Sequence, residues 1–442
     1  MSNQEMGHLQ QVVADLLDEA KKQGASSAEA GVHAQQGLDV NVRLGEIETI
    51  EHTNDHGLGV TVYFGQRKGS ANTTDLSPEA IRETVAAACR IARYTSEDPA
   101  AGLAEAGLMA SDIPDLDLNH PWQIDAQGAA EIALECESAA RDFDARINNS
   151  EGAGVHTQNS LFVYGNTHGF VGGYPTTRHS MSCAVLAGEG EQMQRDFWYT
   201  TSRVPEKLQA AAEVGREAAR RTVARLGSRK IKTTECPVIF RADIAPSLLR
   251  SLFGALRGAS LYRKASFMLD QLGESIFPDW VIIDEDPHLP QGLSSAPFDN
   301  EGVATQHRKI VDTGVLQSYV LDSYSARKLG MQTTGNAGGL RNTRIDSTGE
   351  SFEELLQRMG TGLLVTELMG QGSNPVTGDY SRGAAGFWVE NGEIAYPVEE
   401  ITVAGNLRQM YQDLLAVGAD NDIPGSVDTG SWLIRKMTVA GN

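Results

Sequence analysis

Basic residues are scarce in this 442-residue sequence. Its 37 lysines and arginines stand against 58 aspartates and glutamates, which gives a formal net charge of −21. Because the phosphate backbone of a nucleic acid is repelled by such a surface, the charge argues against a nucleic-acid partner. A cationic ligand or a local basic patch stays compatible with it.

Cysteines and long apolar runs are also few. The four cysteines, Cys89, Cys136, Cys183 and Cys236, show no C-x-x-C spacing. We therefore expect buried, reduced thiols rather than a disulfide framework or a structural zinc site. No apolar run approaches the roughly 18 residues of a membrane span, and Met1–His8 has no basic flank leading into an apolar core, as a signal peptide would. We expect a soluble, cytoplasmic protein without a membrane partner.

Several catalytic motifs are absent as well. The sequence contains no H-E-x-x-H metal motif, no G-x-x-x-x-G-K-[ST] phosphate loop, no G-x-S-x-G nucleophile turn and no dinucleotide-binding fingerprint. The run Gly335–Gly339 is rich in glycine, but it lacks the lysine and the helix start of a phosphate loop, so we interpret it as a turn. From pattern alone, the chain has no self-sufficient catalytic set.

The order of the expected elements suggests three units. A composition with 40% apolar and 21% charged residues predicts two or three globular domains of about 150 residues each. Helical spacing, alternating strands and a second helix follow one another between Leu9 and Tyr94, and the same order recurs between Ala126 and Leu226. The sequence therefore predicts an α+β protein with small helix-flanked antiparallel sheets at the N-terminus and in the middle, and a larger, mixed, β-rich C-terminal domain. The predicted domains are residues 1–110, 115–228 and 235–442.

The stretch Thr366–Ile394 is the most distinctive part of the sequence. It contains six glycines between apolar runs, a density that indicates left-handed turns or close backbone approach in a packed region. Asn391-Gly392 predicts a tight hairpin turn. Turns of this kind could aim the polar residues at a common point, and the alternative is a hairpin packed for shape alone. The candidates for substrate binding or an interface are Glu367, Gly370, Gly372, Asp379, Ser381, Arg382 and Gly383.

Two groups of residues have the composition of metal ligands. His52 and His56 have the spacing of helical ligands, but the surrounding pattern predicts strand and turn, where the two rings need not converge. Asp284, Asp286 and His288 follow a buried strand and could hold a divalent ion, although a solvated acidic loop is the commoner explanation. Three histidines of the middle sheet are expected to make ordinary hydrogen bonds, namely His156, His168 and His179.

The sequence around Thr366–Ile394 closely resembles the TldD/PmbA family, and its PmbA/TldE branch in particular. The matching runs are Thr366-Glu-Leu-Met-Gly-Gln-Gly and Gly378-Asp-Tyr-Ser-Arg-Gly-Ala-Ala-Gly-Phe-Trp-Val-Glu-Asn-Gly-Glu. Shorter matches, such as Ser323-Tyr-Ser-Ala-Arg-Lys-Leu-Gly and Ile401-Thr-Val-Ala-Gly-Asn-Leu, extend the resemblance over nearly the whole chain. The resemblance implies three domains and pairing with a TldD-like subunit in a cytoplasmic metalloprotease that cuts unfolded or peptide substrates.

The chain departs from the family at its metal site. The family's metal-binding subunit carries H-E-x-x-x-H on a helix after a buried strand, together with a late cysteine. The matching helix here reads Leu248-Leu-Arg-Ser-Leu-Phe-Gly-Ala-Leu, with Arg250 and Ala255 at the histidine positions and Ser251 at the glutamate position. All four cysteines lie in the first 236 residues, and Thr429 or a neighbour occupies the region of the late ligand. Since arginine stays protonated and alanine has no donor atom, we expect no metal site and no catalytic residue in this chain.

Three hypotheses stay open at this point. The first is a PmbA/TldE-type subunit that is inactive alone and acts in complex assembly and substrate handling, with zinc in a TldD-like partner. The second is a self-sufficient metallohydrolase with unconventional ligands such as Asp284, Asp286 and His288. The third is a homo-oligomeric peptide-binding or adaptor protein with no enzyme partner. When alone, the chain could also form a homodimer.

Overall fold

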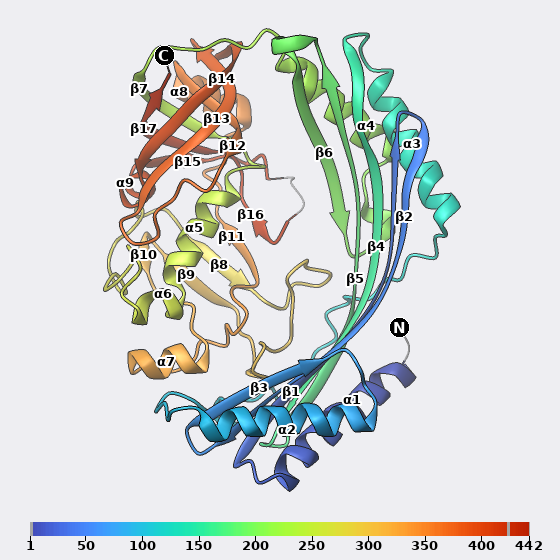
Figure 1. Ribbon diagram of the computed structural model, residues 1–442. Helices are drawn as coiled ribbons and strands as arrows, with labels where there is room; N and C mark the ends of the chain where they lie inside the picture. The colour runs from blue at the N-terminus through green and yellow to red at the C-terminus, as the bar shows by residue number, and fades with distance from the viewer. Residues whose placement is uncertain (1–2, 422–424, 442) are drawn as a thin grey trace.

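A long antiparallel sheet with four helices on one face forms the first half of the protein, and a β-rich part packs opposite its other face (Figure 1). The computed structural model describes residues 3–421 and 425–441; Met1 and Ser2, at the start of the polar segment Met1–His8, lie outside them. The sheet has the strand order β3-β2-β1-β4-β5-β6, with every neighbouring pair antiparallel. Its strands are β1 (Ser27–Arg43), β2 (Glu46–Phe64), β3 (Arg67–Thr73), β4 (Ile147–Asn166), β5 (Val171–Ala187) and β6 (Gln194–Ser202).

The two groups of strands that the sequence predicts are parts of this one sheet. Strand β1 pairs with β2 on one side and with β4 on the other, so that Val40 lies opposite both Ile50 and Val155. The sequence predicts separate strands at 150–155 and 160–164. The structure joins them in β4, because the polar residues between them continue the pairing with both β1 and β5.

Two pairs of helices cover the same face of the sheet at its two ends (Figure 1). Helices α1 and α2 pack on one end through Leu16 and Val85, and helices α3 and α4 pack on the other end through Ala133 and Ala218. Successive residues of a strand point to opposite faces, so the side chains of β1 that do not face these helices face the C-terminal half. The helices are α1 (Asn3–Lys22), α2 (Pro78–Tyr94), α3 (Ala126–Arg141) and α4 (Ala211–Ala224), and short 3-10 helices lie at η1 (Ala106–Leu108), η2 (Gly190–Gln192) and η3 (Pro205–Lys207).

Two further sheets form the C-terminal half. In the larger one the order is β14-β13-β12-β7-β17-β15, and a pairing of β14 with β17 closes the sheet into a barrel. The smaller one has the order β10-β9-β8-β11-β16. The strands are β7 (Thr234–Phe240), β8 (Ile283–Asp286), β9 (Arg308–Asp312), β10 (Val315–Leu316), β11 (Asn342–Ile345), β12 (Gly362–Met369), β13 (Asp379–Glu390), β14 (Glu393–Asn406), β15 (Leu414–Val417), β16 (Val427–Asp428) and β17 (Trp432–Ala440).

The core of this half contains Trp432, Tyr411 and Phe240, which are fully buried. Its helices are α5 (Pro246–Leu256), α6 (Gly258–Tyr262), α7 (Ser323–Leu329), α8 (Phe352–Met359) and α9 (Leu407–Gln412). The prediction of an α+β protein with helix-flanked antiparallel strands and a β-rich C-terminal part is confirmed.

Polar contacts join the two halves at both ends of the long sheet. At one end, Arg225, which directly follows α4, forms an ion pair with Glu367 of β12, with 2.5 Å between Nη1 and Oε2. At the other end, the Tyr324 hydroxyl of α7 donates to Asp98 Oδ2 at 2.7 Å. Among the residues described, no helix combines the length and the apolar character that crossing a membrane requires.

Candidate functional site

The glycine-rich stretch forms the neighbouring strands β12 and β13 and the start of β14, not a linker. Strand β12 pairs with β13 on one side and, in parallel, with β7 on the other. Asn391 and Gly392 connect β13 to β14 with φ angles of 54° and 80°, which a type I′ hairpin turn requires. The predicted hairpin turn is confirmed.

Two glycines of the stretch are required by close contact between backbones. A Cβ atom on Gly386 would overlap the carbonyl oxygen of Leu364, and one on Gly372 would overlap the carbonyl oxygen of Ser381. The Gly372 carbonyl also accepts a hydrogen bond from the Ser381 N–H at 2.7 Å. Gly383 is paired with β12 on one side and with β14 on the other. These backbone groups therefore have their partners within the protein.

The two acidic candidates of the stretch, Glu367 and Asp379, are held in separate contacts. Glu367 forms an ion pair with Arg225 at the C-terminal end of α4. Asp379 accepts hydrogen bonds from Thr377 Oγ1 at 2.7 Å and from Asn406 Nδ2 at 3.2 Å. These two bonds lower the pKa of Asp379. The two carboxylates are therefore directed at different parts of the structure.

The remaining candidates lie near the open ends of β12 and β13. Arg382 donates from Nη2 to the Leu368 carbonyl at 3.4 Å, while Ser381 is exposed on the opposite side of β13. Gly370, with a φ of 72°, begins the loop that leads from β12 to β13. Ser381 and Arg382 are neighbours in the sequence, but their side chains point to opposite faces of β13 because side chains alternate along a strand.

Helix α5 carries Arg250, Ser251 and Ala255, which the resemblance assigns to the family's metal-ligand positions, and these three residues do not share one surface. Arg250 is exposed and lies close enough to Tyr199 of β6 to oppose the rise in the pKa of Tyr199 that burial causes. The Ser251 hydroxyl donates to the Ser247 carbonyl at 3.0 Å. Ala255 is only 1% exposed and belongs to the core.

The second set of proposed ligands is not gathered around a common point. The His288 Nε2 bonds to Thr305 Oγ1 at 3.0 Å, and Asp286 Oδ1 accepts from the His288 backbone N–H at 2.9 Å. Asp284 lies 3.9 Å from His307 instead. Within residues 3–421 and 425–441, no group of three or more His, Cys, Asp or Glu side chains is placed to hold a metal ion.

The other residues considered as ligands also have ordinary environments. His52 and His56 lie on strand β2, where four residues span about 13 Å, so the two rings do not converge. Thr429 accepts a hydrogen bond from Trp432 Nε1 at 2.7 Å. The ordinary hydrogen bonds predicted for three histidines are confirmed: His156 to Asp39 at 2.7 Å, His179 to Thr157 at 2.8 Å and His168 to the Ala104 carbonyl at 3.1 Å.

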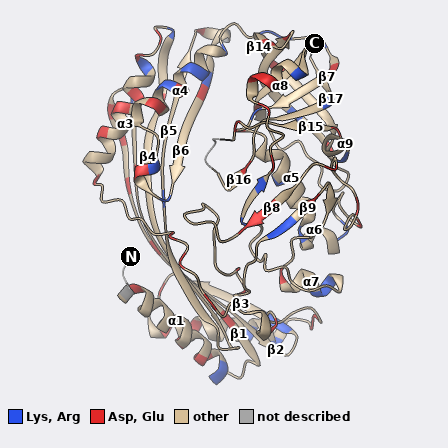
Figure 2. Ribbon diagram, turned by 180° about the vertical axis from the view of Figure 1, so that it is seen from behind, with Lys and Arg blue, Asp and Glu red and all other residues tan. Residues whose placement is uncertain are grey.

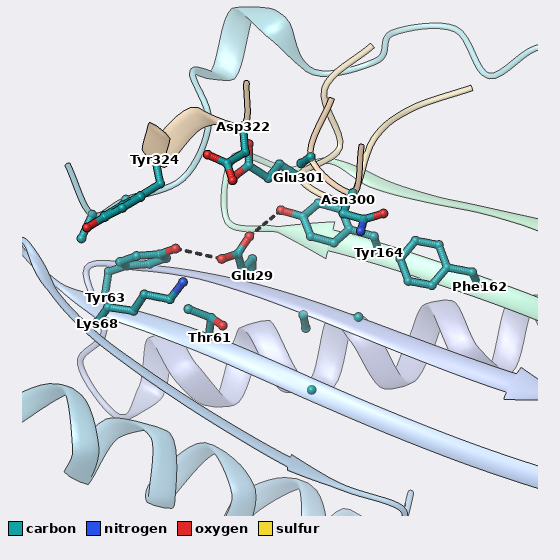
Figure 3. Close-up of a pocket in the computed structure, with 17 residues that line it drawn as sticks. Glu29, Thr61, Tyr63, Lys68, Phe162, Tyr164, Asn300, Glu301, Asp322 and Tyr324 are labelled. Atoms are coloured by element: carbon teal, nitrogen blue, oxygen red, sulfur yellow. Dashed lines mark hydrogen bonds between the residues drawn. The ribbon is translucent and has the colours of Figure 1, made fainter. Parts of the chain in front are cut away.

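A cavity of about 440 Å³, which the sequence reasoning missed, lies between the open face of the long sheet and the C-terminal half (Figure 3). Glu29 of β1 lies on the sheet side, where the hydroxyls of Tyr63 and Tyr164 donate to its two carboxylate oxygens at 2.8 and 2.9 Å. Glu301 and Asp322 line the opposite side (Figure 3). The three carboxylates of the cavity come from distant parts of the chain, and no local sequence motif predicts the cavity.

The electrostatics of this cavity centre on Glu301. Burial raises the pKa of Glu301 to about 7, although the Ser323 N–H, which donates at 2.9 Å, partly opposes this rise. Burial also raises the pKa of Tyr63 and of Tyr164, so both hydroxyls remain protonated and able to donate to Glu29. The cavity can therefore exchange a proton at Glu301 near neutral pH.

Replacing Glu301 with glutamine should stabilise the protein at pH 8 by about 3 kcal/mol, and much less at pH 5. The folded-state pKa near 7 exceeds the ordinary value of 4.5. The unfolded state therefore loses its proton first, and stability falls as the pH rises from about 4.5 to about 7. Glutamine keeps the acceptor for the Ser323 N–H without this cost. Urea unfolding at both pH values measures the difference, with the exposed Glu46→Gln as control. An equal change in the free energy of unfolding at pH 5 and at pH 8 would contradict the raised pKa of Glu301.

Comparison with known proteins gives consistent matches over the whole chain. Three models of the PmbA/TldA metallopeptidase match, with domain 1 at residues 28–92, the central domain at 119–226 and the C-terminal domain at 233–441. The chain is 50% identical over 433 residues to Metalloprotease PmbA of Escherichia coli O157:H7. The matched region covers 98% of this chain and 96% of that protein.

Solved structures share the fold. A Bacteroides thetaiotaomicron protein, described as a candidate modulator of DNA gyrase, superposes with a TM-score of 0.93 at 27% identity and covers 98% of both chains. TldE from Thermococcus kodakarensis superposes with a TM-score of 0.84 at 20% identity, over 97% of this chain and all of that one. At that identity the second likeness concerns the fold alone.

Proposed function

The chain belongs to the PmbA/TldA metallopeptidase family, and on this premise we propose that it is the PmbA/TldE-type subunit of a cytoplasmic metalloprotease. A TldD-like partner would hold the zinc ion. The complex would hydrolyse unfolded proteins or peptides. This chain would serve in complex assembly and in substrate handling, and it would be inactive alone.

The observation that supports the proposal is the chemistry of the side chains on α5. Arg250 carries a permanent positive charge and cannot bind a cation. Ala255 offers only a buried methyl group, and the Ser251 hydroxyl already donates to a carbonyl of its own helix. A zinc ion therefore does not fit the residues at these positions, and no step of hydrolysis is assigned to them.

The pairing of the strands limits how this chain could hold an extended substrate. Strand β13 lies between β12 and β14, so Gly383 and Gly386 cannot offer their backbone to an added strand. Strand addition requires a sheet edge. Strand β6 is such an edge, and its Tyr199 lies near Arg250. We place the substrate on this side of the chain. The loop that begins at Gly370 is the candidate contact with the partner.

Co-expression with the H-E-x-x-x-H relative from the same genome tests the proposal. The two chains are purified separately and together, peptidase activity is measured on an unfolded protein, and zinc is measured by elemental analysis. We expect the pair to be active, zinc to follow the partner, and this chain alone to be inactive. Stoichiometric zinc with chelator-sensitive activity in the lone chain would overturn the proposal, and a genome without such a relative would favour the adaptor hypothesis.

A further inference from the structure

Three arginines meet at one cavity in a protein that is otherwise strongly acidic. A cavity of about 360 Å³ lies between α5, the loop that precedes β11, and the start of β16, and Arg250, Arg257 and Arg341 are among its lining residues. Acidic residues are distributed over both halves of the molecule (Figure 2), which makes this local excess of positive charge distinctive. We propose that this cavity binds a carboxylate group of a peptide.

The break between α5 and α6 fixes the position of Arg257. On one side of this residue the Leu256 carbonyl accepts from the Val320 N–H at 3.0 Å, and on the other side the Gly258 N–H donates to the Val320 carbonyl at 2.9 Å. Opposite, Gly339 has a φ of 106°, and a Cβ atom there would come within 3.0 Å of Arg257 Nη2. The absence of a side chain at Gly339 therefore leaves room for the guanidinium.

The loop that carries Arg341 is held in place by hydrogen bonds to a buried carboxylate. Glu285, 1% exposed, accepts from the Arg341 backbone N–H at 2.7 Å and from Asn336 Nδ2 at 2.8 Å. The Arg341 side chain donates from Nη2 to the Ala337 carbonyl at 3.4 Å, and its buried Nε has no hydrogen-bond partner among the described residues. The loop thus places the Arg341 guanidinium in the wall of the cavity.

Arg250 and Arg257 are free to bind an anion. Within the described part of the chain, neither side chain forms an ion pair with an acidic residue or a hydrogen bond. Guanidinium groups match the two oxygens of a carboxylate with paired, charge-assisted hydrogen bonds. The apolar Phe253, Leu340 and Val427 also line the cavity, so the anion would arrive on a molecule with apolar side chains.

A peptide is the source of the carboxylate that fits these features, and this choice of ligand rests on the proposed function. Arg250 is close enough to Tyr199 of the edge strand β6 to influence the pKa of that residue, and an extended substrate could pair with this strand. The negative charge of the rest of the surface disfavours a carboxylate elsewhere and so directs it to the three arginines. The binding itself requires neither zinc nor a partner chain.

Fluorescence anisotropy of the purified full-length chain tests the proposal. The probes are three N-terminally labelled, otherwise identical apolar heptapeptides: one with a free C-terminal carboxylate, one with a C-terminal amide, and one amide with a single internal glutamate. We expect the free carboxylate to bind about tenfold more tightly than the plain amide. Arg250→Gln and Arg257→Gln should each remove most of this difference. Arg82→Gln, at an exposed position on α2, is the matched control and should bind like the wild type.

The outcomes separate the alternatives. Tight binding of the glutamate-containing amide would support the carboxylate site and identify a side chain as the source. Equal binding of the plain amide and the free carboxylate, unchanged binding by both arginine variants, or no binding up to about 1 mM peptide would overturn the proposal. Because the lone chain is measured without zinc or partner, these results do not depend on which chain carries the peptidase activity. Thermal unfolding of each variant confirms that it is folded.

Discussion

Replacing Arg221 of α4 with methionine should lower the free energy of unfolding by about 3 to 5 kcal/mol. The Arg221 side chain is only 6% exposed, and its Nη2 lies 2.7 Å from Asp243 Oδ2 while its Nε lies 3.5 Å from Asp196 Oδ1. The guanidinium also lies over the ring of Trp198, 4.8 Å from its centre. Methionine keeps much of the apolar contact but leaves two nearly buried carboxylates without this cation.

The loss should be large because Asp243 depends on its cations. Burial alone would raise the pKa of Asp243, but Arg241 and Arg221 more than offset this effect, so that its pKa lies below the ordinary value. Asp243 belongs to the C-terminal half and Arg221 to the helix that covers the long sheet. The same substitution should therefore also weaken the contact between the two halves.

Urea unfolding of the variant measures the effect, and the neighbouring residue supplies the control. Arg220 forms an ion pair with Glu217 on the surface of the same helix, at 2.7 Å, and its side chain is 60% exposed. Since exposed pairs contribute little, Arg220→Met should cost less than about 1 kcal/mol. A cost for Arg221→Met no greater than that of the control would show that the buried pair adds no net stability.

Local patterns are sufficient for much of the fold. Alternating burial along β1 and the Asn391-Gly392 turn follow from residue type and spacing, and the structure confirms both. The joining of β1 to β4 could not be predicted in the same way. Their paired residues, such as Val40 and Val155, are more than a hundred positions apart, and nothing in either strand specifies the other as its neighbour.

The cavities are less predictable than the strands for a related reason. Glu29 and Glu301 face one another only because the C-terminal half packs on the open face of the long sheet (Figure 3). Arg250 and Arg341 line one cavity because a loop anchored on Glu285 reaches α5. The resemblance does assign Arg250 to a metal-ligand position of the family. It could not reveal that other arginines lie beside it.

Restoring the family's metal-binding residues on α5 should produce an unstable and inactive protein. The triple variant Arg250→His, Ser251→Glu, Ala255→His supplies the missing donors in sequence, but Ala255 is only 1% exposed and packs within the core of the C-terminal half. Its carbonyl also accepts from Ser266 Oγ at 2.6 Å, which holds the following loop against the helix. An imidazole at this position would overfill the core and bury a polar ring, at a cost of about 3 kcal/mol or more.

Single substitutions separate the two parts of this expectation. Arg250→His changes an exposed residue and should alter the free energy of unfolding by less than about 0.5 kcal/mol, whereas Ala255→His alone should account for nearly the whole loss of the triple variant. Urea unfolding gives the stabilities, and elemental analysis with a peptidase assay gives the metal content and activity. A triple variant that unfolds like the wild type, binds one zinc ion and cleaves a peptide would show that the site needed only its ligands. The core is closed around Ala255. A metal site could therefore be recovered only if the side chains that pack against Ala255 were also made smaller, because the ligand residues alone do not create the space for an imidazole.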